Sequence, residues 1–212
     1  MDIAERILDA MLSIEEKGLN CGTSGNISTR LGEGMLITPT GIPPARLGPE
    51  MMVEMSLDGG WQGQFEPSSE WAMHAAIYRA FPQAGAVVHA HPDACVALSC
   101  MREPLPAFHY MVASFGGDSV PCSRYALFGT PQLADVAVEA LDGRTACLLA
   151  NHGMICHAAN LDKAVAAALK LETLARQYLL VRSAGHPVLL EGREIVSVLD
   201  RYKGYGQQRP NI

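Results

Sequence analysis

Two kinds of hydrophobic spacing alternate along the chain. Apolar residues recur at helical intervals from Ile3 to Leu12 and stop before Gly18, a typical helix terminator. Short apolar or β-branched runs between turn-forming residues indicate strands instead. The pattern predicts helices over 2–18, 69–80, 92–101, 131–141 and 161–184, and strands over 27–30, 35–38, 51–57, 86–90, 146–149 and 154–157.

The order of these segments indicates the class of fold. Strands and helices intermix throughout, and no linker, repeat or low-complexity stretch separates them. Such an arrangement is typical of an α/β or α+β protein in which helices cover a sheet. We therefore expect one domain over residues 1–212.

Composition narrows the function. With 212 residues, 49% hydrophobic and 18% charged, the chain is expected to fold around a substantial core. A net charge of −6 without a Lys/Arg cluster argues against a nucleic-acid partner. No apolar run is long enough for a bilayer, and the N-terminus has no signal-peptide pattern. The six cysteines form no CxxC pair, so we expect a reduced, cytoplasmic protein without a membrane partner.

Three histidines carry the clearest chemistry. Within the strand-like run VVHAH (87–91), His89 and His91 alternate and so point to the same side. His152 lies between two further predicted strands and is followed by a glycine that permits a tight turn. Three imidazoles so arranged can bind zinc and leave one coordination position open. Two histidines at this spacing alone more often form hydrogen bonds within the protein than bind a metal. The additional presence of His152 favours the metal site.

A carboxylate and several hydroxyls could extend this site. Ser68, Ser69 and Glu70 precede a predicted helix, where hydroxyls cap the helix or bind an anion together with its free amides. Glu70, close to both a phosphate and a metal, could move a proton. The loops 22–26 and 38–41 also offer hydroxyls and amides, although each could be an ordinary turn.

The C-terminal segment 202–206 places two tyrosines, Tyr202 and Tyr205, among glycines. A phenol beside a cation can act as a general acid. On the sequence alone, however, a frayed tail is the preferred interpretation of this segment.

Taken in order, these segments resemble the class II aldolases of the fuculose-phosphate aldolase type, which are related to ribulose-phosphate 4-epimerases. The resemblance implies a single α/β domain with a central mixed, largely antiparallel sheet covered by helices on both faces. It spans nearly the whole chain and is carried by the motifs GTSGNIS, LITPTGIP, PSSEWAMHAAIY, AVVHAH, HYM, SVPCSRYALFGT, ANHGMI and YKGYG.

The resemblance also implies roles for individual residues. Each subunit would hold one Zn²⁺, or another divalent metal, through His89, His91 and His152, with Glu70 at or beside the fourth position. Glu70 would also act as the acid/base. Tyr110 would handle the aldehyde oxygen, and Tyr205 would be a mobile tyrosine; both could serve a neighbour's zinc in a homotetramer. The residues that match phosphate-binding positions are Gly25, Asn26, Thr40, Gly41, Ser68 and Ser69.

The implied reaction is reversible cleavage of a ketose 1-phosphate, such as L-fuculose 1-phosphate, to dihydroxyacetone phosphate and an aldehyde through a metal-stabilised enediolate. Glu70 favours an aldolase, because epimerases tend to carry aspartate there. Aldolases of 5-deoxyribulose or methylthioribulose 1-phosphate, and the family's dehydratases and decarboxylases, are harder to exclude. A structural domain like the adducin head is disfavoured by the intact histidines and Glu70.

Overall fold

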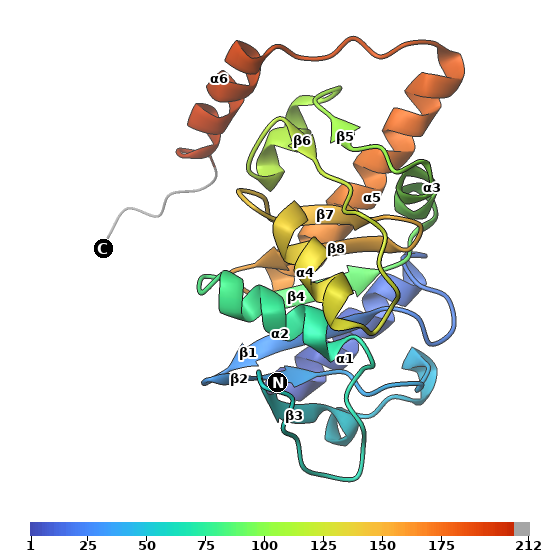
Figure 1. Ribbon diagram of the computed structural model, residues 1–212, viewed down its shortest axis with the longest axis vertical. Helices are drawn as coiled ribbons and strands as arrows, with labels where there is room; N and C mark the ends of the chain where they lie inside the picture. Colours follow the sequence, from blue (N-terminus) through green and yellow to red (C-terminus); the bar gives the residue numbers. More distant parts are fainter. Residues whose placement is uncertain (206–212) are drawn as a thin grey trace.

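A six-stranded sheet forms the centre of the computed structural model, which describes residues 1–205 (Figure 1). All of its ladders are antiparallel, and the single parallel pairing within residues 1–205 is an isolated bridge between Cys122 and Leu148. The prediction of a largely antiparallel sheet is thereby confirmed. The strands, in spatial order, are β3 (Val53–Ser56), β2 (Gly34–Ile37), β1 (Asn26–Leu31), β4 (Ala86–Ala90), β8 (Gly153–Ala158) and β7 (Ala146–Leu149).

Helices cover both faces of this sheet, as predicted. One face packs against α1 (Ile3–Glu16), α3 (Asp93–Met101) and α5 (Leu161–Ala184). The other packs against α2 (Trp71–Ala80) and α4 (Pro131–Ala140).

Strand alternation distributes the side chains of β4 between these two cores. Val88 lies in the core with α1, α3 and α5, whereas Val87 lies in the core with α2 and α4. Successive residues of a strand point to opposite faces, so His89 shares the face of Val87. The metal-ligand candidates therefore face the α2 side.

Hydrogen bonds fix the helix that follows His91. Glu172, a buried residue of α5, accepts from the backbone N–H of Ala94 at 3.1 Å and of Cys95 at 3.0 Å. These donors belong to the first turn of α3, whose amides have no partner within the helix. The contact fastens the start of α3 to α5, directly after the end of β4.

The C-terminal helix α6 (Gly192–Tyr202) was not predicted. Glu191 and Glu194 form its capping box, and Ile195 is buried against Ala107 and Ala113. Figure 1 shows α6 apart from the layers of the main sheet, beside the two-stranded sheet of β5 (Leu105–Pro106) and β6 (Ser119–Val120). Apolar residues recur at helical spacing within this segment, and this pattern could have predicted the helix. Tyr202 is the last residue of α6, so the interpretation of this segment as a frayed tail was wrong for Tyr202.

Other predicted boundaries shift by a few residues. The strand predicted over 51–57 is shorter because Pro49–Met51 forms a 3-10 turn. The helix predicted over 69–80 begins at Trp71, with Glu70 as the residue that precedes it. Between residues 110 and 115 the chain forms η3 (Tyr110–Phe115), for which no element was predicted.

The cysteines are free thiols, in line with the expectation of a reduced protein. Cys95, Cys147 and Cys156 are buried, whereas Cys21 and Cys100 are exposed. Within residues 1–205, no helix is both long and apolar enough to cross a bilayer.

Candidate metal centre and active site

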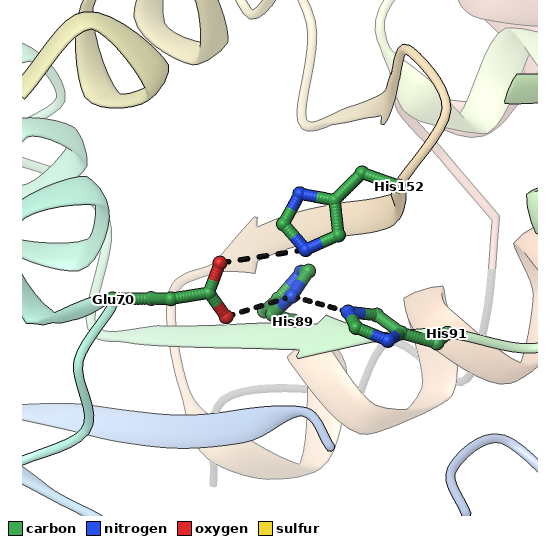
Figure 2. A group of neighbouring side chains, drawn as sticks. All are labelled: Glu70, His89, His91 and His152. Carbon is green, nitrogen blue, oxygen red and sulfur yellow. Dashed lines mark hydrogen bonds and ion pairs between the residues drawn. The ribbon is translucent and has the colours of Figure 1, made fainter. Parts of the chain in front are cut away.

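Three imidazoles and one carboxylate converge at the end of β4 (Figure 2). The Nε2 atom of His89 lies 2.9 Å from Nε2 of His91 and 3.1 Å from Oε2 of Glu70. The Nε2 atom of His152 lies 3.4 Å from Oε1 of Glu70. One donor atom from each of the four residues falls within 4.8 Å of every other. The structure thus brings all four predicted ligands together.

The hydrogen bonding of these residues fits a bound cation. The Nδ1 atom of His89 lies 2.9 Å from the carbonyl oxygen of Met154, which accepts its proton and leaves Nε2 with a free lone pair. That lone pair faces a carboxylate oxygen. The other oxygen of Glu70, Oε1, is buried and lies 3.4 Å from Nε2 of His152, but it accepts no hydrogen bond from the described residues. Converging electron-pair donors of this kind suit Zn²⁺ or a similar divalent metal.

The protonation states agree with this arrangement. Burial, followed by the charges of the neighbouring histidines, lowers the pKa of His91 to about 3. Burial and His89 lower the pKa of His152 to about 4. Burial by itself raises the pKa of Glu70, but its interactions with His89, His152 and Asn26 outweigh burial and hold that pKa well below its usual range. At neutral pH, His91 and His152 are therefore neutral ligands facing an ionised Glu70.

A tight turn presents His152 to this centre. Its backbone N–H donates to the hydroxyl of Ser99, which is fully buried on α3, at 3.3 Å. Asn151 adopts a left-handed conformation with φ of 53°, and its side chain accepts a hydrogen bond from Arg102 at 2.8 Å. At Gly153, a Cβ would lie 2.6 Å from the carbonyl oxygen of Ala90 and 2.7 Å from the His91 ring. Only glycine therefore allows β8 to approach β4 beside the metal centre.

A hollow of about 350 Å³ opens beside Glu70, His91 and His152. Beside the hollow, a hydrogen bond joins the loop after β2 to the segment before α2. The backbone N–H of Ser68 donates to the carbonyl oxygen of Thr38 at 3.0 Å. Every residue expected to bind phosphate borders the hollow. These residues are Gly25, Asn26, Thr40, Gly41, Ser68 and Ser69.

The walls of this hollow carry little positive charge. None of the described residues that line it is a lysine or arginine. A bound phosphate would therefore depend on hydroxyls, amides and a metal cation rather than on basic side chains. Gly25 permits one of these loops, because its φ is 74° and a Cβ there would overlap the side chain of Asn20.

Several further residues border the hollow, and no individual role was predicted for them from the sequence. They lie within three of the motifs that carry the family resemblance, which was the available signal. These residues are Thr23, Ser24, Tyr125, Ala126, Phe128 and Asn151.

The two predicted catalytic tyrosines lie elsewhere in the protomer. Tyr110 and Tyr205 line a separate hollow of about 410 Å³, together with Lys170 and Arg201. Tyr110 is 51% exposed and Tyr205 is 78% exposed, so neither is held in the core. None of the four metal-centre residues borders that second hollow.

The other histidines lie outside the metal centre. His157 stacks on Phe81 and faces the carbonyl of Arg144 at 3.2 Å, and His186 is exposed. His109 caps η3 by accepting from the N–H of Met111 at 3.2 Å. His74 is fully buried and hydrogen-bonded to Ser28.

Known proteins resemble this chain over nearly its whole length. The family described as Class II Aldolase and Adducin N-terminal domain matches residues 5–179. A 5-methylthioribulose-1-phosphate/5-deoxyribulose-1-phosphate aldolase of Rhodospirillum rubrum is 44% identical over 94% of this chain and 90% of its own length. An L-fuculose phosphate aldolase of Escherichia coli O6:H1 is 45% identical over 96% of this chain and 95% of its own length.

The solved structures agree with the sequence matches. An L-fuculose 1-phosphate aldolase superposes with a TM-score of 0.92 at 36% identity, covering 95% of this chain and 96% of the other. The fold and the sequence therefore point to one family. The chain belongs to the class II aldolase family and is an enzyme of the aldehyde-lyase type.

Proposed function

We propose that the protein is a Zn²⁺-dependent aldolase that reversibly cleaves a ketose 1-phosphate, such as L-fuculose 1-phosphate, into dihydroxyacetone phosphate and an aldehyde. The observation that carries this proposal is the convergence of Glu70, His89, His91 and His152 beside a hollow lined by hydroxyl- and amide-bearing loops. A metal and a phosphate can be bound side by side there, as this substrate requires.

The metal would be held by His89, His91 and His152, with Glu70 occupying or bordering the fourth position. When bound, zinc supplies Lewis-acid stabilisation of the negative charge that develops on the C2 oxygen. Neutral imidazoles suit this task, because they add no positive charge that would repel the cation.

In the direction of carbon–carbon bond formation, the carboxylate of Glu70 removes a proton from the hydroxylated carbon beside the carbonyl of dihydroxyacetone phosphate. The electron pair of that C–H bond moves towards the carbonyl oxygen and gives the enediolate. The enediolate carbon then attacks the aldehyde carbon, while Tyr110 donates a proton to the aldehyde oxygen. Cleavage follows the same path in reverse, so Glu70 returns its proton to carbon.

The phosphate would be held by the amides and hydroxyls of Gly25, Asn26, Thr40, Gly41, Ser68 and Ser69. Binding there, away from the bond that breaks, fixes the orientation of the reacting carbons. Tyr125 and Phe128 give the hollow an apolar wall. That wall suits an aldehyde fragment ending in a methyl or methylthio group, and the relatives named above act on L-fuculose phosphate or on 5-deoxyribulose and 5-methylthioribulose 1-phosphates.

A homotetramer would complete the site. Tyr110 and Tyr205 border a hollow of their own and remain largely exposed, so each is available to a neighbouring protomer's metal. We place the enzyme in the cytoplasm, consistent with its free thiols.

A substrate panel tests the proposal. Zinc-loaded protein is supplied with fuculose 1-phosphate, 5-deoxyribulose 1-phosphate, methylthioribulose 1-phosphate and ribulose 5-phosphate, and release of dihydroxyacetone phosphate is followed. Release from one of the three 1-phosphates supports the aldolase. Recovery of a pentulose phosphate as its C4 epimer would instead identify an epimerase. Loss of water from the sugar phosphate would identify a dehydratase, and loss of carbon dioxide would identify a decarboxylase.

A further inference from the structure

A row of buried polar side chains runs from Glu70 into the protein interior. Glu70, His74 and Tyr78 follow one another at intervals of four residues and so lie on one face of α2 and its N-terminal end. Asn26 and Ser28 alternate on β1 and face α2. Four residues of helix advance about 6 Å, close to the spacing of alternate strand residues. The two rows therefore interdigitate.

Hydrogen bonds connect all five residues in order. The Nδ2 atom of Asn26 lies 3.1 Å from Oε2 of Glu70, and Oδ1 of Asn26 lies 2.6 Å from Nε2 of His74. The hydroxyl of Ser28 lies 2.7 Å from Nδ1 of His74 and 2.9 Å from the hydroxyl of Tyr78. Each of these residues is at least 90% buried, so each polar group depends on these partners.

The carboxylate at one end determines the direction of every bond. Ionised Glu70 can only accept, so the amide nitrogen of Asn26 must donate to it and the amide oxygen must face His74. The Nε2–H of His74 then donates to that oxygen, and Nδ1 accepts the proton of Ser28. Tyr78 in turn donates to Ser28. Burial keeps His74 neutral by lowering its pKa to about 3, as this order of donors requires.

We propose that His74 is a positioning residue that, through the amide of Asn26, orients Glu70 for proton transfer and turns the N–H₂ end of Asn26 towards the phosphate hollow. This inference rests on the proposed roles of Glu70 and Asn26. An amide flipped by 180° would present its oxygen to the carboxylate and to the phosphate, two anions that it would repel. His74 in its Nε2–H tautomer opposes that flip, because an Nε2–H group can pair only with the amide oxygen.

The first test is the tautomer of His74 in the zinc-loaded wild-type enzyme. Protein labelled with ¹⁵N-histidine is examined by long-range ¹H–¹⁵N NMR at neutral pH, and His74 is assigned by comparison with His74→Gln. We expect a neutral ring protonated on Nε2. A ring protonated on Nδ1, or on both nitrogens, would overturn the proposal whatever the variants do.

The second test compares three variants as zinc-loaded enzymes. His74→Phe keeps a side chain of similar volume but removes the hydrogen bonds to Asn26 and Ser28. We expect kcat to fall about 10- to 100-fold, the loss that is typical when a residue supporting the groups of a metal centre is replaced. Competitive inhibition by inorganic phosphate should weaken in parallel. His74→Gln can restore a donor to Asn26 and should recover most of both properties. Thr29→Val alters a buried hydroxyl on the opposite face of β1 and should change neither.

A merely structural role for His74 predicts a different outcome. His74→Phe would then lower the melting temperature but leave kcat, KM and inhibition by phosphate unchanged, which would contradict the proposal. If His74→Phe does not fold, the tautomer and the His74→Gln kinetics still decide. A wild-type enzyme that cleaves no sugar phosphate would overturn the proposed function instead, and the tautomer and phosphate binding would remain measurable.

Discussion

His89 shows how much of this site depends on hydrogen bonds that a sequence does not display. The spacing of His89 and His91 predicts that both face one side, and the structure confirms this. The sequence does not reveal that the carbonyl of Met154 receives the Nδ1 proton of His89, because Met154 lies 65 positions away. Nor does it reveal that His74 connects to Glu70 through Asn26.

Replacement of Glu70 by glutamine tests its role as the base. The variant preserves the size of the side chain but removes the carboxylate that exchanges the proton with carbon. We expect kcat to fall about 100- to 10,000-fold, while bound zinc, measured by elemental analysis, is retained by the three histidines. Glu54→Gln, an exposed carboxylate on β3, serves as the matched control. Undiminished cleavage by Glu70→Gln would refute the proton-transfer assignment.

The buried imidazole of His74 should make stability depend on pH. Its pKa falls from 6.5 to about 3 on folding, so below about pH 6.5 the unfolded chain binds a proton that the folded protein does not. The contribution of His74 to the free energy of unfolding therefore decreases as pH falls through this window. Between about pH 7.5 and about pH 5 the loss is roughly 2 kcal/mol, at about 1.4 kcal/mol per pH unit.

Urea denaturation of the wild type and of His74→Gln at these two pH values measures this contribution. Glutamine does not titrate, so the variant should lose about 2 kcal/mol less than the wild type on acidification. Equal losses in the two proteins would mean that His74 does not remain neutral in the folded state.

The strands and helices differ in how far their sequences predict them. β4 is buried on both sides and β-branched, and α5 is long and rich in alanine and leucine, so both were predicted at their observed positions. α6 was missed, although Ile195, Val198 and Leu199 recur at helical spacing and pack on one side of the helix. The resemblance to a known family, rather than periodicity, supplied the antiparallel order of the sheet.

Close packing of β8 on β4 gives a prediction for Gly153. In Gly153→Ala the new methyl group would overlap the carbonyl oxygen of Ala90 and the His91 ring, so the strands must separate. We expect a loss of about 1–3 kcal/mol in the free energy of unfolding, together with weaker zinc binding in a chelator competition. Gly192→Ala on α6 has open space around it and should bind zinc normally. Normal zinc affinity in Gly153→Ala would contradict this account.

The molecule as a whole divides its proposed catalytic groups between two hollows. Glu70 and the metal ligands border one, whereas Tyr110 and Tyr205 border the other. The fold of one chain could be predicted from the sequence and its resemblance. The surface that a second chain covers could not, since pairing between protomers leaves no periodic pattern in the sequence. Whether the domain extends over all of residues 1–212 stays a prediction, since the described residues end at 205.

Hybrid oligomers test whether the site is shared. His89→Ala removes a metal ligand and Tyr110→Phe removes the proposed acid, so each homogeneous variant should be nearly inactive. If Tyr110 serves a neighbour's metal, co-expression of the two variants should restore a measurable fraction of wild-type cleavage, because some interfaces combine an intact metal centre with an intact tyrosine. A mixture no more active than its components would place Tyr110 outside the shared site.

The central claim is that this chain cleaves a ketose 1-phosphate with a metal held by His89, His91, His152 and Glu70. The most direct test is the release of dihydroxyacetone phosphate from L-fuculose, 5-deoxyribulose and methylthioribulose 1-phosphates before metal removal, after treatment with a chelator and after addition of Zn²⁺. We predict cleavage of at least one substrate, its loss on chelation and its recovery with zinc. Cleavage that persists in metal-free protein, or no cleavage of any substrate by zinc-loaded protein, would contradict the account.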